Sequence, residues 1–296
     1  MNIEKVYFNA TDGLELVGLL HKGESKTKRI IISIHGMTSN CLKKREDVIA
    51  RKVTDNEIDY FGFNNRGHDV HAYSGKMIGD EYKKLNIGTA YEDVLDSIYD
   101  IKGAILEMVS RGYNEIYLQG HSLGCTKIVY SYNRLKYEKD EVLKYIKGII
   151  LLSLVDIPKA QRVYLGDNYD NIMNIALDNE KSNNIDKIMP KDSFIHPIST
   201  KTYLRYFRDY EDIDFAKYYD ENYDYKELNN IDVPLFMRWG NVNEMIEQDA
   251  GDLAKMLNEK IRNNKKNINY IDGADHGYTD RYEVLADEIL SFIQKY

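Results

Sequence analysis

The chain has 296 residues, of which 43% are hydrophobic, and this is enough for a sizeable core in one large α/β domain or two smaller ones. A formal net charge of −8 argues against nucleic acid as the main partner, because phosphate binding requires clustered Lys and Arg. No stretch has the roughly 18 to 20 apolar residues of a membrane helix, and the first residues lack the regions of a signal peptide. We therefore expect a cytoplasmic protein that has no membrane partner.

The chain begins with the pattern of antiparallel strands. Residues 3–9 and 14–21 alternate apolar and polar around a turn at Asp12-Gly13, which predicts a β-hairpin. Residues 28–34 end in a run of isoleucines that is typical of a strand buried on both faces. Residues 59–64 predict a second buried strand.

Strands and helices then alternate. A long loop is expected up to Gly88, followed by a helix over 89–111 and a strand over 115–119. Further strands are predicted at 147–154, 233–239 and 267–271, and further helices at 42–54, 244–263 and 280–294. Such alternation, with right-handed crossovers, predicts a mostly parallel sheet covered by helices on both faces.

Residues 156–232 interrupt this alternation. They contain no clear buried strand and are too long for an ordinary loop, so we predict a mainly helical insertion between core segments 1–155 and 233–296. The insertion holds 16 acidic and 10 basic residues, and we expect it to disfavour strongly anionic substrates near the entrance to a site. Its aromatic residues either pack it onto the body or form a substrate-binding lid. They include seven tyrosines: Tyr203, Tyr206, Tyr210, Tyr218, Tyr219, Tyr223 and Tyr225.

Residues 120–124 carry the most specific signal. They read Gly-His-Ser-Leu-Gly, between an apolar strand and a helix-compatible run, which is the setting of a G-x-S-x-G nucleophile elbow. A sharp turn there holds the serine in a strained backbone geometry with its hydroxyl free above the sheet. We predict Ser122 as the nucleophile.

A serine hydroxyl needs a base, and His276 is the best candidate. It lies in a glycine-bearing loop, Asp272–Gly277, between the last strand and the last helix, above the sheet edge where the elbow stands. The other histidines lack such a position, and none forms a strong metal-binding pattern. We predict no metal and no cofactor.

The oxyanion of an acyl-transfer intermediate needs N–H donors. The backbone N–H of Leu123, at the start of the elbow helix, is one candidate. The second is the N–H of Met37, in the turn after the first parallel strand. The two cysteines, Cys41 and Cys125, are expected to be reduced, with Cys125 as a small packing residue.

Together these features resemble the α/β-hydrolase superfamily over nearly the whole chain. They are the opening hairpin, His35-Gly36, Asn65-Arg66-Gly67-His68, the elbow, the insertion and His276. The resemblance implies a mostly parallel eight-stranded sheet, a cap formed by 156–232 above the active site, and esterase activity. Other members are peptidases, lipases, acyltransferases or non-catalytic, so the fold alone does not fix the reaction.

The third member of the triad departs from the superfamily pattern. The aspartate expected after the seventh strand is Asn243, and a neutral amide cannot stabilise an imidazolium. Glu244, one residue later, is our preferred acid, and Asp156 at the end of the sixth strand is the runner-up. Glu247 and Asn243 itself remain open, whereas Asp275 is disfavoured because it points away if His276 points inward.

The sequence therefore predicts a serine hydrolase that cleaves carboxylic esters of small molecules through an acyl-enzyme on Ser122. Two alternatives remain: an amidase or peptidase with the same triad, and a non-catalytic ligand-binding relative.

Overall fold

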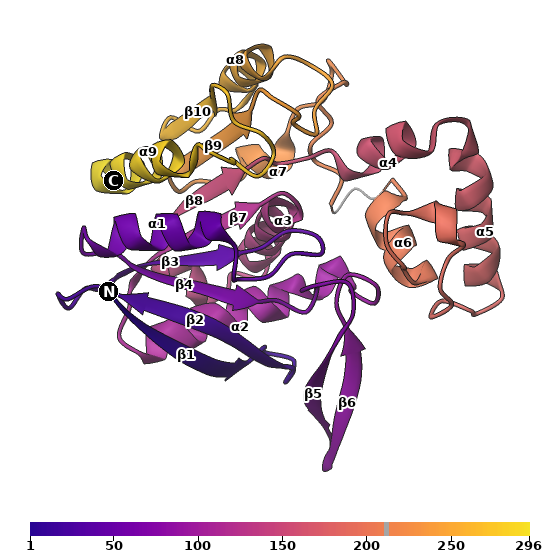
Figure 1. Ribbon diagram of the computed structural model, residues 1–296, viewed down its shortest axis with the longest axis horizontal. Helices are drawn as coiled ribbons and strands as arrows, with labels where there is room; N and C mark the ends of the chain where they lie inside the picture. Colours follow the sequence, from indigo (N-terminus) through magenta and orange to yellow (C-terminus); the bar gives the residue numbers. More distant parts are fainter. Residues whose placement is uncertain (210–212) are drawn as a thin grey trace.

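Eight strands form the central sheet of the computed structural model, which describes residues 1–209 and 213–296. Their order in the sheet is β1-β2-β4-β3-β7-β8-β9-β10 (Figure 1). The strands are β1 (Asn2–Asn9), β2 (Glu15–Lys22), β3 (Arg29–Ile34), β4 (Asp59–Asn64), β7 (Glu115–His121), β8 (Ile146–Leu152), β9 (Leu235–Gly240) and β10 (Lys266–Ile271).

The sheet is antiparallel only at its first edge. β2 pairs antiparallel with β1 and β4, whereas every later pairing, from β4 with β3 to β9 with β10, is parallel. The predicted mostly parallel eight-stranded sheet is confirmed. Its parallel strands all end at one edge, where ligands bind in folds of this type.

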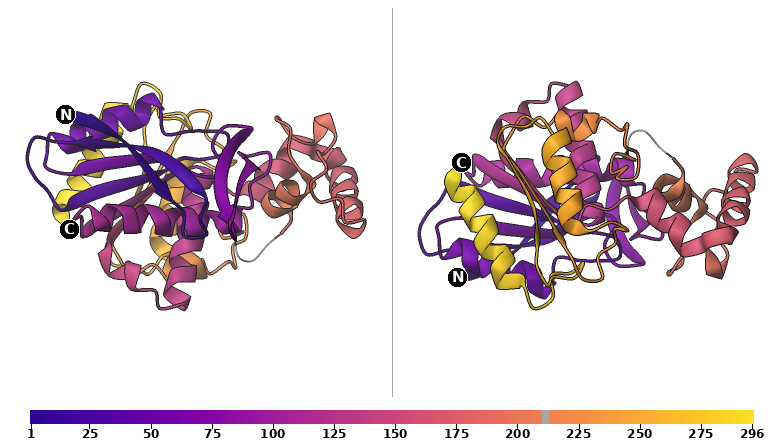
Figure 2. Two further views of the ribbon diagram at one scale, coloured as in Figure 1. Left: turned by 90° about the horizontal axis from the view of Figure 1, so that it is seen from below. Right: turned by 90° about the horizontal axis from the view of Figure 1, so that it is seen from above.

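Helices cover both faces of the sheet, as predicted. α1 (Lys44–Thr54) and α9 (Tyr282–Lys295) pack on one face through apolar residues such as Ile49 and Ile289. On the other face α2 (Ser97–Ser110), α3 (Leu123–Tyr137) and α8 (Ala250–Lys260) share the larger core. Figure 2 shows the two layers from opposite sides. No helix within 1–209 and 213–296 combines the length and apolar character that a membrane span needs.

The long loop expected before Gly88 is instead a hairpin that projects from the body (Figure 1). It consists of β5 (Ala72–Ile78) and β6 (Glu81–Ile87), joined at Gly79 with φ of 60°. Most of its side chains are exposed or half-buried, so the apolar alternation that signals a strand is missing.

Two helices are shorter than predicted. The helix expected over 89–111 begins only after Asp93, as the 3-10 turn η1 (Val94–Asp96) followed by α2, and Asp93 caps that turn by accepting from the Leu95 N–H. The helix expected over 244–263 begins at Ala250, because Asp249 accepts from the N–H groups of Gly251 and Asp252. The 3-10 turn η2 (Glu141–Tyr145) precedes β8.

Residues 156–232 divide into two parts. The first holds the helices α4, α5 and α6, which lie beyond the end of the sheet (Figures 1 and 2) and share an apolar cluster that also includes Val94 and Leu123. In the second part Phe215, Tyr225 and Leu228 join the larger core. The elements are α4 (Ile157–Leu165), η3 (Gly166–Asn168), α5 (Tyr169–Lys181), η4 (Lys191–Ser193), α6 (Thr200–Phe207) and α7 (Lys226–Asn229).

The tyrosines of 203–225 mostly serve packing. Tyr203, Tyr206, Tyr218 and Tyr225 are buried, whereas Tyr219 is 39% exposed. Tyr210 lies outside the described residues. The four buried rings are therefore core residues and are not available to a ligand.

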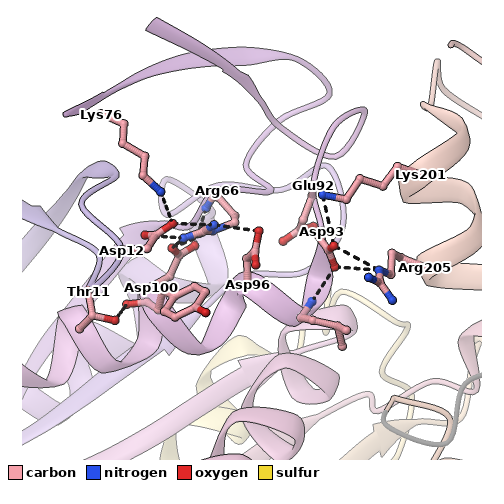
Figure 3. Close-up of polar contacts among 12 residues, drawn as sticks. Thr11, Asp12, Arg66, Lys76, Glu92, Asp93, Asp96, Asp100, Lys201 and Arg205 are labelled. Carbon is pink, nitrogen blue, oxygen red and sulfur yellow. Dashed lines mark hydrogen bonds and ion pairs between the residues drawn. The ribbon is translucent and has the colours of Figure 1, made fainter. Parts of the chain in front are cut away.

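Helix α6 is fastened to the body at the segment just before η1. The Asp93 carboxylate pairs with Lys201 at 3.3 Å and with Arg205 at 3.1 Å (Figure 3). Next to it, the Tyr206 hydroxyl donates to Glu92, which also pairs with Lys127 of α3. The side chains of Glu92 and Lys127 are fully buried, so a charged link joins α6 to the elbow helix.

The Arg66 side chain binds the opening hairpin to α2. Its guanidinium lies 2.7 Å from Asp100 and 3.0 Å from Asp12, and Asp96 is a further partner at 3.2 Å (Figure 3). Asp100 is fully buried, and it also accepts a hydrogen bond from the Arg66 N–H at 2.8 Å. In this protein the Arg66 position of the Asn65–His68 motif therefore has a structural role.

Candidate active site

The elbow at Ser122 has a strained geometry. Between β7 and α3, Ser122 has φ of 54° and ψ of −125°, a conformation that costs on the order of 1–3 kcal/mol for a non-glycine residue. Its N–H donates to the Leu152 carbonyl at 2.9 Å. A Cβ at Gly124 would lie 2.1 Å from the Ile34 carbonyl oxygen, which explains the need for glycine there.

His276 and Glu244 lie in direct contact. The Nδ1 of His276 is hydrogen-bonded to Oε1 of Glu244, whose side chain is only 2% exposed. The other carboxylate oxygen accepts from the Ser153 hydroxyl at 2.7 Å and from the Gly240 N–H at 3.0 Å. Burial by itself would raise the pKa of Glu244, but the bonds from His276, Ser153 and Gly240 hold that pKa below its usual value. The carboxylate is therefore ionised and fixes the His276 proton on Nδ1.

The other candidate acids have different partners. Asp156 caps α4 by accepting from the Lys159 N–H at 3.0 Å, and burial raises the pKa of Asp156 to about 6. Glu247 lies 3.7 Å from the Lys159 ammonium. Asn243 is exposed and has φ of 49°.

Asp275 faces its own turn. Its carboxylate accepts from the N–H groups of Gly277 at 3.0 Å and Thr279 at 2.7 Å. Among the five acids and amides considered from the sequence, only Glu244 is hydrogen-bonded to the His276 ring.

Ser122 and His276 line the same cavity, which has a volume of about 480 Å³. This volume is within the range of small-molecule sites. Gly36, Met37 and Thr38 form another part of its wall, so the turn after β3 faces the elbow.

The turn after β3 approaches the elbow so closely that only glycine fits at its start. A Cβ at Gly36 would lie 2.8 Å from the His121 carbonyl oxygen and 3.0 Å from the Ser122 Cβ. In the described part of the chain, the N–H groups of Met37 and Leu123 have no hydrogen-bond acceptor. Both N–H groups predicted as oxyanion donors are therefore available; Met37 lines the cavity, and Leu123 directly follows Ser122.

Three residues that the sequence analysis missed support this arrangement. The Nε2–H of His121 donates to the His276 carbonyl at 2.7 Å, and burial lowers the pKa of His121 well below its usual value, so the ring is neutral. Ser153, with φ of 53°, holds Glu244, and the Tyr278 hydroxyl lies 3.1 Å from the Ser153 hydroxyl. No local sequence signal marks Ser153 or Tyr278, because their contacts cross between strands.

The cysteines offer no reactive thiol. Cys125 is buried, its thiol donates to the carbonyls of Gly120 and Leu152, and burial raises its pKa. Burial also raises the pKa of Cys41 to about 11. No group of three or more His, Cys, Asp or Glu residues within 1–209 and 213–296 is arranged to hold a metal ion.

Comparison with known families identifies the chain. Residues 95–286 match the lecithin:cholesterol acyltransferase family. This range is about two thirds of the sequence, and it includes the elbow and the Glu244–His276 pair. The chain belongs to this family. A comparison with curated protein sequences gave no match.

Solved α/β-hydrolase structures superimpose on this family member over almost its full length. Est1E from Butyrivibrio proteoclasticus, solved with ferulic acid, has a TM-score of 0.66 and 16% identity, and the match covers 98% of each chain. DcsB, in complex with a substrate analogue, has a TM-score of 0.70 and 15% identity over 99% of each chain. A soluble variant of monoglyceride lipase from Saccharomyces cerevisiae has a TM-score of 0.65 and 14% identity over 100% of this chain and 96% of that chain.

These likenesses establish the fold. The protein is an α/β-hydrolase, as the sequence resemblance predicted, and its family membership indicates an enzyme that acts on esters.

Proposed function

We propose that the protein hydrolyses carboxylic esters through an acyl-enzyme on Ser122, with His276 as general base and acid and Glu244 as the triad acid. The observation that carries this proposal is the Glu244–His276 hydrogen bond beside a cavity that Ser122 also lines. A buried carboxylate on Nδ1 leaves Nε2 of His276 to take the serine proton.

The first half of the reaction forms the acyl-enzyme. The Ser122 Oγ attacks the ester carbonyl carbon while its proton passes to His276 Nε2, and the N–H groups of Met37 and Leu123 donate to the resulting oxyanion. The imidazolium, stabilised by Glu244, then gives the proton to the departing alcohol oxygen as the C–O bond breaks. In the second half, water gives a proton to His276 Nε2 and attacks the acyl carbon. The bond between that carbon and Ser122 Oγ then breaks, and His276 returns the proton to Oγ, which releases the acid and restores Ser122.

The test is Ser122→Ala against a panel of 4-nitrophenyl esters from acetate to decanoate, with a feruloyl ester added. The variant should lose all measurable turnover and keep the circular dichroism spectrum and melting temperature of the native protein. Turnover that persists in Ser122→Ala contradicts the nucleophile assignment.

A labelling experiment separates the two alternatives that the sequence left open. A fluorophosphonate should label Ser122 if the site is activated, and absence of labelling favours a non-catalytic ligand-binding relative. A paired ester and anilide assay distinguishes an esterase from an amidase, because the triad of an amidase must also protonate the nitrogen of the leaving amine before the C–N bond breaks.

Family membership favours acyl transfer as a second function of the same site. The acyl-enzyme on Ser122 would then react with the hydroxyl of an alcohol in place of water, and His276 would take the proton of that hydroxyl. Adding a primary alcohol during ester turnover measures this. A transferase forms a new ester and releases less free acid, whereas a hydrolase yields free acid at every alcohol concentration.

A further inference from the structure

The cavity beside Ser122 has a basic wall. It is lined by Lys43, Lys44 and Arg45, at the beginning of α1, together with Ser122 and His276. Lys43 and Lys44 are exposed, and neither ammonium forms an ion pair with any residue in 1–209 or 213–296. The Lys44 ammonium lies 5.7 Å from the ring centroid of Tyr282, which also lines the cavity. Two ammonium groups without an ion-pair partner among the described residues therefore stand at the site.

None of the nearby carboxylates in the described part of the chain forms an ion pair with Lys43 or Lys44. Glu46 is buried and pairs with Arg45 at 2.7 Å, so this pair contributes no net charge. The Asp275 carboxylate accepts hydrogen bonds within its own turn. The Asp69 carboxylate, beyond Ser39, accepts from the Asn40 side chain at 2.9 Å.

The described acidic residues of 156–232 do not line this cavity. None of its lining residues belongs to 156–209 or 213–232. Figures 1 and 2 show α4, α5 and α6 beyond the end of the sheet, whereas α1 lies along its face. The expectation that this segment disfavours anionic substrates concerns the entrance to the site and stays a prediction.

The start of α1 adds to the positive potential. Its N-cap residue, Lys43, makes no side-chain hydrogen bond to the first turn, and the two acidic residues of that turn, Glu46 and Asp47, pair with Arg45 and Arg51. Ammonium groups without an ion-pair partner at the wall of a cleft attract ligands of the opposite charge.

We propose that the natural ester carries an anionic group on its acyl or alcohol part, and that Lys43 and Lys44 bind this group while the ester carbonyl faces Ser122. This inference rests on the proposed function for the position of the ester bond. The binding preference, however, can be measured without catalysis.

Binding is measured by titration calorimetry on Ser122→Ala, which prevents cleavage. One pair of ligands is monomethyl adipate and the same ester with its free carboxylate converted to the primary amide. A second pair carries the charge on the alcohol part: the butanoate ester of 4-hydroxybutanoic acid and its amide. In at least one pair the carboxylate should bind about fivefold more tightly than the amide, which is the upper effect of an exposed ion pair. The preference should weaken as salt is raised.

Variants then assign the preference to the cavity. Ser122→Ala with Lys43→Gln and Lys44→Gln should bind carboxylate and amide equally. The matched control replaces Lys26 and Lys28, exposed lysines that precede β3 at the opposite edge of the sheet, by Gln, and it should keep the preference. Equal binding of carboxylate and amide in both pairs, or a preference unaffected by Lys43→Gln and Lys44→Gln, overturns the inference.

The two proposals fail in different ways. If native protein cleaves neutral esters but Ser122→Ala shows no carboxylate preference, the esterase assignment stands and the anion site is wrong. If the carboxylate preference is present and the native protein cleaves neither ester of a pair, the anion site stands and the esterase assignment is wrong.

Discussion

At the scale of single residues, the proposed triad acid is the residue directly after the position where the superfamily pattern predicts it. Asn243 occupies the position where related sequences place an aspartate, but it is exposed, with φ of 49°. Glu244 follows it, and the extra methylene of its side chain lets the carboxylate reach His276 from a buried position. A glutamate thus supplies the charge that the amide at 243 cannot.

Glu244→Gln should therefore lower kcat by about four orders of magnitude, as the loss of the acid does in a serine-protease triad. Asp156→Asn is the matched comparison, because Asp156 is also buried but caps a helix. It should change kcat little and cost about 1 kcal/mol of stability at most, since Asn also caps well. A large kcat loss in Asp156→Asn with none in Glu244→Gln would reverse the assignment.

His35, in the turn after β3, should make the stability of the protein depend on pH. Its Nδ1–H donates to the Gly36 carbonyl at 2.9 Å, and its Nε2 accepts from the Asn65 N–H at 3.2 Å. Burial, reinforced by the Lys127 ammonium, lowers the pKa of His35 to about 3. The ring stays neutral in the folded protein at pH values where an unfolded histidine is protonated.

At these pH values the unfolded state binds one proton more than the folded state. The contribution of His35 to the unfolding free energy is therefore fully present above the ordinary histidine pKa of 6.5, and it is lost as the pH falls from there towards 3. Lowering the pH from 7 to 5 should therefore decrease the unfolding free energy by about 2 kcal/mol through His35. Urea denaturation at both values checks this. His35→Gln should show a smaller difference between the two pH values, and an unchanged difference would exclude His35 as the cause.

At the scale of elements, the elbow depends on close approach between backbones. A Cβ at Gly120 would lie 2.6 Å from the backbone of Gly124, and one at Gly124 would lie even closer to Ile34. These contacts join β7, α3 and β3 where the nucleophile stands. The sequence pattern predicts them because both glycines belong to the elbow motif.

Gly124→Ala should lower kcat by at least tenfold and reduce stability, because overpacking typically costs about 1–3 kcal/mol. Gly62→Ala, in buried strand β4, is the control, since its nearest contact would be an ordinary 3.4 Å to Cys41. Thermal denaturation and ester turnover measure both variants. Equal behaviour of the two would show that close approach at the elbow is not required.

At the scale of the whole molecule, the helices α4–α6 are tied to the catalytic body through a buried charge pair. Glu92 and Lys127 are both fully buried, and Tyr206 of α6 donates to Glu92. The apolar cluster of these helices also includes Leu123 and contacts Met37, the two predicted oxyanion donors. A movement of α4–α6 would thus change the packing around Leu123 and Met37.

Lys127→Met should lower the unfolding free energy by about 3–5 kcal/mol, because it leaves the Glu92 carboxylate buried without its partner. Lys127→Met with Glu92→Gln removes both charges and should recover part of that loss. Denaturant unfolding of the three proteins measures it. A double variant no more stable than Lys127→Met would show that the unpaired charge is not the cause.

The sequence by itself determined the sheet and the turn at Ser122, and it predicted His276 as the base. Apolar runs, glycine spacing and turn residues act locally, so strand positions and the Gly120–Gly124 turn follow from neighbouring residues. The hairpin β5–β6 was missed because its exposed side chains carry no apolar alternation. Only the tertiary structure shows the contact of Glu244 with His276, the contacts of His121 and Ser153, and the basic cavity wall. Each depends on groups that are distant in the chain and meet where β7, β8 and β9 end, and no local pattern records such a meeting.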